Sequence, residues 1–313
     1  MDNLTHSLVG ALMGRMGLKR LSPRAMPALI LSANLPDIDS FVAPLFGVEA
    51  IAAHRGFTHG VGGLLTMPFL AAAIILLFEK LRCDKKEHIP WLGLLVVCFL
   101  GTLSHPLLDF LNTYGTRLGD PLTQRWFHAD TLFIVDPWIW IALILGLELS
   151  WKAERAGGNW TRPALWAGFA VLGYIGLNLA ISARAVAVTR PLVERVAEPR
   201  MIIAGEVPLE FWKRRMIWRG DQFGGGGDYD LLEGLNHATL DPRIDPLNLD
   251  EPRLAAAKLR DPHVRAFLSW SIMPIVVNES GHSFLTDQRF YDGGRRVGTR
   301  NFLIPLDKDG PSS

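Results

Sequence analysis

Long apolar stretches dominate the first 184 residues of the chain and are missing from the remainder. A helix needs about 20 mostly apolar residues to cross the hydrocarbon layer of a membrane, and somewhat fewer when flanking charges reach the interface. Four stretches come close to that length, and each is nearly free of charge. They cover residues 61–78, 91–108, 134–149 and 164–183. Two shorter apolar segments, 4–18 and 25–35, come first, and their length leaves open whether they are half-spanning, re-entrant or packed against the others.

The positions of the basic residues favour membrane helices over the buried helices of a large soluble protein. Lys and Arg gather in alternate loops, as the positive-inside rule requires of a multi-pass protein. The rule places these basic loops in the cytoplasm and the intervening loops, with Arg55, Arg117 and Arg125, on the other side. The basic loops contain Lys19, Arg20 and Arg24, then Lys80, Arg82, Lys85 and Lys86, then Lys152, Arg155 and Arg162.

Residues 185–313 have a different character, with frequent Pro, Gly and charged residues and no candidate span. Short apolar or aromatic runs bounded by turn residues predict strands over 200–207, 214–220, 266–277 and 282–292, and residues 251–260 predict a short helix. The glycine run 224–227 predicts a flexible hairpin loop, since it lacks the Lys-Ser/Thr ending of a phosphate-binding loop.

The predicted fold therefore has two domains. Residues 1–184 form an α-helical polytopic membrane domain with four long spans plus two shorter N-terminal helices. Residues 185–313 form a small soluble α+β domain outside the membrane, and counting spans places it in the periplasm of a bacterial cell, beyond the inner membrane.

Composition and charge narrow the function classes. The chain is 49% hydrophobic, which is too apolar for an ordinary soluble enzyme. Its net charge of +1 offers no excess of basic residues to neutralise the phosphates of a nucleic acid. The basic run Lys213–Arg215 is small and is better explained as a solvated strand end. The two cysteines, Cys83 and Cys98, imply no disulfide framework.

Imidazoles and carboxylates lie at the ends of the apolar segments, and all of these ends face the non-cytoplasmic side. Ionisable groups at the edge of a membrane are costly unless they are paired, solvated or bound to a cation. His and Asp together form the mixed nitrogen and oxygen shell that zinc, iron or manganese accepts. The candidate metal ligands are His6, Asp37, Asp39, His54, His59, His105, Asp109 and Asp136.

Spacing within this set suggests how the side chains would converge. His105 and Asp109 lie four apart, so they share one helix face if the helix continues through Pro106. Asp37 and Asp39 lie two apart, which suits a turn in which one carboxylate bridges two ions. Paired ions about 3.5–4 Å apart are the usual arrangement for hydrolysing phosphate esters or amides. We therefore expect divalent metal ions, with zinc as the first choice and two or more in number.

Catalytic roles are assigned to three residues. Asp37 or Asp39 would act as the bridging carboxylate or base, and Arg55 would hold an anionic substrate oxygen through a charge-assisted bond. Arg55 could equally bind a lipid headgroup without any part in catalysis.

Structural roles stay open for several candidates. Asp136 precedes Pro137 and could cap the helix that follows, and Asp39 could cap a turn. His6 could be an ordinary interfacial histidine. His128 and Asp130 are better explained as loop residues, with Trp126 as an interface anchor.

At these residues the chain resembles a bacterial family, the LexA-binding, inner-membrane-associated hydrolases, also called membrane-bound metal-dependent hydrolases. The likeness covers most of the chain. It rests on THSLVG around His6, PDID at Asp37 and Asp39, HRGFTH at His54 and His59, SHPLLD at His105 and Asp109, NTYGT at 112–116 and IVDP at Asp136, with weaker support from FLSWSIMP and DQRF. The resemblance implies a helical core similar to that of zinc-dependent phospholipase C and the single-strand nucleases, with several metal ions held by His and Asp.

These observations favour a metal-dependent hydrolase that cuts a phosphoester or similar bond in a lipid or lipid-linked substrate at the outer face of the inner membrane. The alternative is a non-catalytic binding or regulatory membrane protein in which the same cluster is a structural metal site. Transport would need polar groups at mid-span, and the long spans offer little beyond Glu148 and Asn178. Membrane lipids are the expected partners, and no protein partner is indicated.

Overall fold

The computed structural model describes residues 1–42, 51, 54–81, 88–279, 281–291 and 302–307. These residues form two compact units, one containing most of the residues up to 179 and the other the residues from 180 onward. The division falls within helix α8 (Thr161–Val193), the helix that also contains the expected domain boundary after residue 184. Residues 82–86 of the second basic loop lie outside the described residues.

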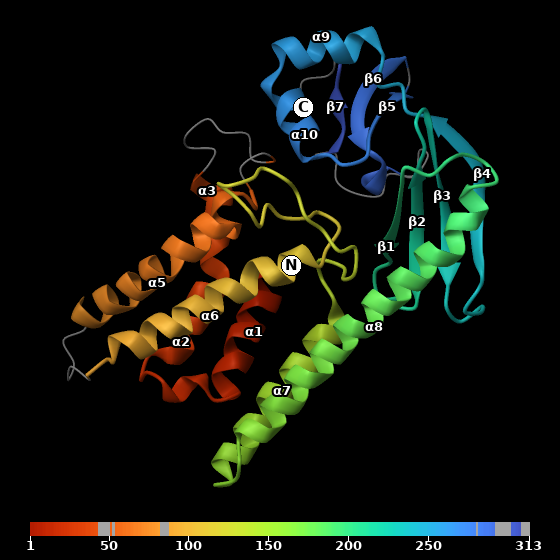
Figure 1. The fold of residues 1–313 in the computed structure, drawn as a ribbon. Coiled ribbons are helices and arrows are strands. Elements are labelled where there is room, and N and C mark those ends of the chain that lie inside the picture. The colour runs from red at the N-terminus through yellow and green to blue at the C-terminus, as the bar shows by residue number, and fades with distance from the viewer. Residues whose placement is uncertain (43–50, 52–53, 82–87, 280, 292–301, 308–313) are drawn as a thin grey trace. The chain divides into compact units, whose positions relative to one another are not determined.

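Every regular element in the described part of the N-terminal unit is a helix (Figure 1). Both short N-terminal segments form helices, and the apolar stretches predicted as spans form longer ones. The elements are α1 (Asn3–Arg15), η1 (Leu18–Arg20), α2 (Ala25–Asn34), η2 (Leu35–Ile38), α3 (Asp39–Val42), η4 (Phe57–His59), α5 (Val61–Leu81), α6 (Trp91–Phe110), α7 (Pro137–Arg155) and the first part of α8.

Three of the described helices, α5, α6 and α8, are long and apolar enough to cross a membrane. The prediction of four long spans is not confirmed. The third predicted span, 134–149, becomes helix α7, which begins only at Pro137 and continues to Arg155. Every 18-residue stretch of α7 contains at least three charged side chains from its second half, so the helix is more polar than the apolar run suggested.

Small residues allow the N-terminal helices to pack closely. Helix α2 packs against both α1 and α6. A Cβ atom at Gly10 of α1 would lie 2.8 Å from the Leu29 carbonyl oxygen of α2. A Cβ atom at Gly101 of α6 would overlap the Ser32 hydroxyl of α2. Glycine at these contacts brings the helix backbones together, as is typical of helix pairs in membranes.

Basic residues gather at the opposite end of α1 from His6. Arg15 and Lys19 both form ion pairs with Glu154 near the end of α7. The Trp160 ring lies within 5.3 Å of the Arg15 guanidinium carbon, 4.0 Å of the Lys19 ammonium and 4.9 Å of the Arg20 guanidinium carbon. The aromatic face attracts these cations and fixes the basic end of the helical unit.

The C-terminal unit contains two antiparallel sheets, one of four strands in the order β1-β2-β3-β4 and one of three in the order β5-β6-β7. The end of α8 packs on one face of the larger sheet, where Ile181 and Ala185 meet Met216 and Tyr229. The elements are β1 (Met201–Glu206), β2 (Lys213–Arg219), β3 (Phe223–Asp230), β4 (Ala238–Pro246), α9 (Pro252–Arg260), α10 (Pro262–Trp270), β5 (Pro274–Glu279), β6 (His282–Asp287), η5 (Gln288–Phe290) and β7 (Ile304–Pro305).

Two predictions about this unit are wrong in detail. The glycine run 224–227 is part of strand β3, which pairs with β2 and β4, and is not a hairpin loop. The run 266–277 is divided between the end of helix α10 and strand β5, and is not one strand. Its first residues, Ala266, Phe267 and Trp270, are buried at helical spacing. The small α+β domain itself is confirmed.

Candidate metal centre

Helix α6 supplies two of the predicted ligands from its last turns. The helix continues through Pro106 to Phe110, so His105 and Asp109 lie on one face as the spacing predicted. The Nε2 atom of His105 is 3.4 Å from the Asp109 carboxylate, and both side chains are fully buried. The other ring nitrogen of His105, Nδ1, lies 2.6 Å from the Ala33 carbonyl oxygen at the end of α2. This contact fixes the ring so that Nε2 faces the cluster.

The short helix η4 brings His59 to the same point. Its Nε2 atom lies 3.0 Å from Nε2 of His105 and 3.2 Å from the Asp109 carboxylate. Thr58 and Asp39 contact the other ring nitrogen, Nδ1, at 2.9 and 3.4 Å. Two imidazole nitrogens that face each other beside a buried carboxylate are an arrangement that a cation would stabilise.

Asp37 completes the buried group and also joins a second one. From η2, its carboxylate lies 3.3 Å from Nε2 of His105 and 3.5 Å from Nε2 of His59. Two groups of side chains could each hold a metal ion, one buried and one more exposed. In each group, one ligand atom from every residue lies within 4.8 Å of the ligand atoms of the others. The buried group is Asp37, His59, His105 and Asp109, and the second is Asp37, Asp39 and His54.

His6 lies directly against the buried group. Its ring stacks on His105 with the ring centroids 3.8 Å apart, and its Nε2 atom is 3.5 Å from the Asp109 carboxylate. The side chain is fully buried, yet neither ring nitrogen has a hydrogen-bond partner among the described residues. A buried imidazole without a hydrogen-bond partner is costly. Its position therefore fits a further ligand of the cluster. The amino group of Met1 also contacts Asp109.

Asp39 holds the His54–His59 segment in place. One carboxylate oxygen accepts the Arg55 backbone N–H at 3.0 Å and the Thr58 hydroxyl at 2.6 Å, and the other lies 2.9 Å from Nδ1 of His54. Burial opposes the charged form of Asp39, but its contacts with His54 and His59 outweigh burial and hold its pKa well below the usual range. Asp39 thus orients the surrounding residues, whether or not it also binds an ion.

The same electrostatics act on the other groups outside the long helices. Burial disfavours the charged forms of Asp37 and His59. The contacts of Asp37 with His105 and His59 nevertheless lower the pKa of Asp37 well below the usual range. Contacts with Asp109, Asp37 and Asp39 outweigh burial and raise the pKa of His59 to about 10. Three carboxylates around one imidazole create a strongly cation-attracting environment, and a metal ion would satisfy it as a proton does.

Arg55 lies beside the cluster in a constrained conformation. Its φ angle is 60°, a left-handed backbone that side-chain-bearing residues rarely adopt. The guanidinium donates to the Asn112 side-chain oxygen at 2.9 Å, lies 3.3 Å from the Asp109 carboxylate and lies over the Tyr114 ring. A strained residue held by this many contacts is typical of a functional site.

Three other residues considered from the sequence lie elsewhere. Asp136 caps helix α7, where its side chain accepts the Trp138 backbone N–H at 3.0 Å and the Tyr174 hydroxyl at 3.0 Å. It belongs to neither metal-compatible group in the described part of the chain, so capping accounts for its position. His128 and Asp130 contact each other at 2.6 Å and are also absent from both groups.

Sequence reasoning did not single out Asn112 and Thr58 as individual site residues. Asn112 is fully buried, and its side-chain oxygen accepts from Arg55 and from the backbone N–H of Tyr114 at 3.0 Å. Thr58 bonds both Asp39 and His59. Neutral hydrogen-bonding residues carry no charge pattern. The available signal was their place inside the quoted segments NTYGT and HRGFTH.

The chemistry of this set of donors fits a divalent metal ion. Four histidines and three carboxylates converge from α1, η2, the Asp39–His59 region and α6, and the buried His6 nitrogens lack hydrogen-bond partners in the described structure. Imidazole and carboxylate donors suit zinc, iron and manganese alike, so the geometry supports metal binding without choosing the metal.

Comparison with known proteins places the helical part of the chain in a family. Residues 1–185 match the model of the family described as "YdjM inner membrane protein", and this match includes every candidate ligand. The chain is also similar to the uncharacterized protein YfhP of Bacillus subtilis (strain 168), with 25% identity over 283 residues, which cover 87% of this chain and 80% of YfhP. No solved structure matches the chain.

Proposed function

The chain belongs to the YdjM inner membrane protein family, and from this membership and the His/Asp cluster we propose that it is a membrane-embedded metal-dependent hydrolase. Its substrate is a lipid or lipid-linked molecule with a phosphoester or similar bond, cleaved at the outer face of the inner membrane. The C-terminal domain lies on that same, periplasmic side.

One observation carries the proposal, namely that two metal-compatible groups share Asp37. The group of Asp37, His59, His105 and Asp109 is mostly buried, whereas the second group includes His54, whose side chain is 26% exposed. A structural metal site is closed by its protein ligands, whereas a catalytic site keeps a position open to water and substrate. The partly exposed His54 side chain in the second group supports a catalytic role.

Divalent ions held here would supply Lewis acidity and a water molecule of lowered pKa. Arg55 would hold an anionic oxygen of the substrate and stabilise charge that develops on it, because its guanidinium is anchored by Asn112 beside the cluster. Asp37 would bridge the two groups. Asp39 would hold His54, Arg55 and Thr58 in position through its hydrogen bonds, and its carboxylate would be available to accept a proton.

Exposed apolar side chains near the cluster support a lipid substrate. Phe41 follows Asp39 by two residues and is 76% exposed, and Phe57 precedes His59 by two residues and is 46% exposed. Large exposed apolar side chains beside a polar site suit contact with acyl chains. They favour a lipid or lipid-linked phosphoester over a small water-soluble ester.

Metal analysis combined with activity tests this proposal. Detergent-purified wild type should retain divalent metal and hydrolyse at least one phosphodiester or phosphomonoester lipid presented in mixed micelles. His59→Ala and His105→Ala should lose both metal and activity. The matched control is His128→Ala, since His128 lies in the same unit but outside both groups, and this variant should keep both.

The buried four-residue group also suits a structural metal in a non-catalytic protein, because four protein ligands can close a tetrahedral site. That alternative predicts tightly bound metal in wild type, no hydrolysis of any lipid phosphoester, and loss of folding on metal removal. A wild-type protein with no divalent metal above trace would contradict both functions.

A further inference from the structure

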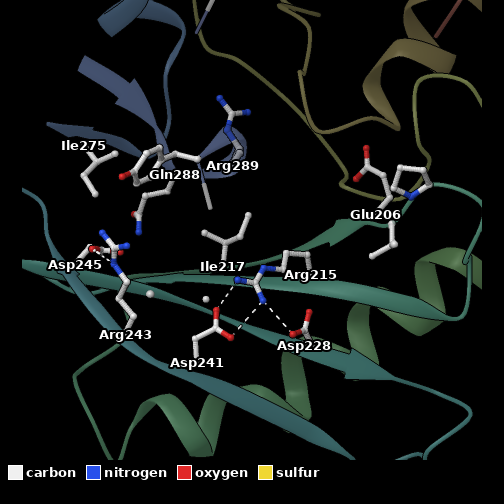
Figure 2. Close-up of a pocket in the computed structure, with 15 residues that line it drawn as sticks. Glu206, Arg215, Ile217, Asp228, Asp241, Arg243, Asp245, Ile275, Gln288 and Arg289 are labelled. Carbon is white, nitrogen blue, oxygen red and sulfur yellow. Dashed lines mark hydrogen bonds and ion pairs between the residues drawn. The ribbon is translucent and has the colours of Figure 1, made fainter. Parts of the chain in front are cut away.

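The C-terminal unit contains a cavity of about 320 Å³ over one face of the β1–β4 sheet (Figure 2). Its floor is formed by Arg215 and Ile217 of β2, Gly225 and Gly226 of β3, and Asp241 and Arg243 of β4, while Ile275, Gln288, Arg289 and Tyr291 line the other side. Its volume lies at the lower end of the range of about 300–1,000 Å³ typical of small-molecule sites. The cavity belongs entirely to the C-terminal unit and is separate from the metal centre.

The glycine run of β3 creates room for this cavity. A Cβ atom at Gly224 would overlap the Gln288 side chain, and one at Gly226 would lie 2.6 Å from Nη2 of Arg215 and overlap Asp241. Side chains at these positions would displace the polar groups that line the cavity. The run therefore lets a polar surface lie close to the strand backbone, a common use of glycine at ligand sites.

The charges that line the cavity are balanced. Arg215 contacts Asp241 at 2.5 Å and Asp228 at 3.1 Å, as the dashed lines in Figure 2 show, and Arg243 contacts Asp245 at 2.7 Å. Arg289 contacts Asp287 at 2.9 Å. Because each guanidinium already faces a carboxylate, the cavity offers neither a concentrated positive field for a phosphate nor a convergent set of carboxylates for a cation. A neutral ligand suits it better than an ion.

A buried amide oxygen points to a ligand that donates hydrogen bonds. Gln288 is 7% exposed and lines the cavity, and its Oε1 atom has no hydrogen-bond partner in the described structure. Figure 2 shows this side chain extending toward the sheet. Leaving such an acceptor unpaired is costly, so a hydroxyl donor placed here would be favourable. The rim is accessible, since 64% of the Asp228 side chain and 54% of the Arg243 side chain are exposed.

We propose that this cavity binds a neutral sugar unit. Sugar hydroxyls both donate and accept hydrogen bonds, and this matches a wall on which carboxylates and an amide oxygen accept while guanidinium groups donate. Ile217, Ile275 and the ring of Tyr291 supply apolar surface for the CH groups of the sugar ring. The sugar could come from a free oligosaccharide or from the headgroup of a glycolipid, and the experiment below separates these sources.

Binding is measured with the full-length protein in nanodiscs. The soluble arm uses an array of immobilised neutral oligosaccharides, followed by calorimetry with the best of them. The lipid arm uses monoglucosyldiacylglycerol within the nanodisc, read out by protection of the amides of residues 288–291 from hydrogen exchange. A heparin oligosaccharide and spermine serve as anionic and cationic probes.

The expected result is saturable binding of a neutral sugar in one arm, with weaker or no binding of heparin and spermine. Gln288→Leu and Asp241→Asn should each weaken sugar binding about tenfold, as loss of a hydrogen bond within a buried site predicts. Asp241→Asn should also gain affinity for heparin, because Arg215 loses a compensating carboxylate. Lys258→Gln, on the exposed face of α9, should change nothing.

Gln288→Leu removes an acceptor that has no protein partner in the described structure, so its thermal unfolding should match wild type. Arg243→Gln provides a second variant at the exposed rim, where 54% of the Arg243 side chain is exposed. It should weaken binding about threefold, since one exposed hydrogen bond is lost. Absence of binding to every neutral sugar in both arms would overturn the proposal. Equal binding by wild type and all three cavity variants, or stronger binding of heparin or spermine than of any sugar, would overturn it as well.

Discussion

Asn112 is the residue that most directly positions Arg55. Its side-chain oxygen accepts a hydrogen bond from the Arg55 guanidinium at 2.9 Å. The Asn112 side chain is fully buried. The same oxygen also accepts the backbone N–H groups of Tyr114 at 3.0 Å and Gly115 at 3.3 Å, so its contacts are to Arg55 and to the loop after α6. Its effect on function should therefore pass through Arg55, and this separates it from the metal ligands.

Asn112→Ala should lower hydrolytic activity about 10- to 100-fold, the usual effect of losing a residue that orients a site, while metal content stays near that of wild type. Arg55→Ala should give a similar phenotype. Metal analysis and kcat/KM measured on the same preparations test this. Loss of metal in Asn112→Ala would mean that the residue supports the ligands and not Arg55.

In the C-terminal unit, Asp287 is a fully buried carboxylate. Its carboxylate accepts the Ser271 hydroxyl at 2.5 Å and the Met273 backbone N–H at 3.2 Å, and pairs with Arg289. Burial opposes its ionisation, but Arg289 and Ser271 lower the pKa of Asp287 below its usual value. A carboxyl group with a depressed pKa stabilises the fold above its unfolded-state pKa of about 3.9, and this stabilisation is lost as the pH falls through the folded-state pKa.

Asp287→Asn should therefore destabilise the C-terminal unit by about 3 kcal/mol at pH 7, since it removes the carboxylate that pairs with the buried Arg289. The difference from wild type should shrink below about pH 4, where the unfolded-state carboxyl takes up a proton. Hydrogen exchange of the β5 and β6 amides in the full-length protein reports both effects. A difference that does not vary with pH would show that the pairing contributes little.

At the scale of elements, the α2–α6 contact connects packing to the metal centre. Gly101 lies one turn before His105, and a Cβ atom there would overlap the Ser32 hydroxyl and lie 3.0 Å from the Leu29 carbonyl oxygen. The next turn of α6 holds His105 against the Ala33 carbonyl oxygen of α2. The distance between these two helices therefore determines whether the His105 ring is oriented correctly.

Gly101→Val should push α6 away from α2, reduce bound metal several-fold and lower thermal stability by about 1–3 kcal/mol, the usual cost of overpacking. The matched control is Gly173→Val in α8, where a Cβ atom would meet nothing within 4 Å. This control should retain metal and stability. Equal metal content in the two variants would show that metal binding does not depend on the α2–α6 contact.

The sequence predicted most helices correctly but was less informative where the local pattern is ambiguous. Residues 61–78 and 91–108 are long and uniformly apolar, a pattern typical of membrane-spanning helices. Residues 266–277 combine a helix end with a strand, because a short apolar run fits either period. The run 224–227 has no side chains whose alternation could indicate a strand. It becomes part of β3 because its backbone pairs with β2 on one side and β4 on the other.

Within the site, the charged residues could be predicted and their neutral supports could not. His105 and Asp109 followed from helical spacing, and His59 from its place before a long helix. Asn112 contacts Arg55 over a sequence separation that no local pattern reveals. The capping of α7 by Asp136, which the sequence left open, depends on a backbone geometry that only the structure provides.

At the scale of the whole molecule, the two ends of the helical unit carry different kinds of polar residue: the His/Asp cluster lies at one end and the basic residues lie at the other. His6 and Asp136 lie at the starts of α1 and α7, while Arg15 and Glu154 lie near the ends of those helices, beside Lys19 and Trp160. The positive-inside rule predicts that the basic end faces the cytoplasm and that the His/Asp cluster faces the opposite side of the membrane.

Cysteine labelling tests this orientation. In a Cys83→Ser background, Asn159→Cys at the basic end should react with a membrane-impermeant maleimide only after the cells are opened. Lys258→Cys in the C-terminal domain should react in intact spheroplasts, since the proposed function places that domain in the periplasm. The remaining cysteine, Cys98, is buried and should stay unlabelled in both. Labelling in the reverse order would invert the assignment.

In the proposed function both metal-compatible groups draw on Asp37, so cation binding at one group would depend on whether the other is occupied. The buried group would fill first, and the orientation that its ion imposes on the shared carboxylate would raise or lower the affinity of the outer position. Thermodynamic reciprocity requires the outer cation to alter retention of the inner one by the same factor. Stepwise titration should thus yield two unequal dissociation constants in wild type and a single one in Asp37→Asn.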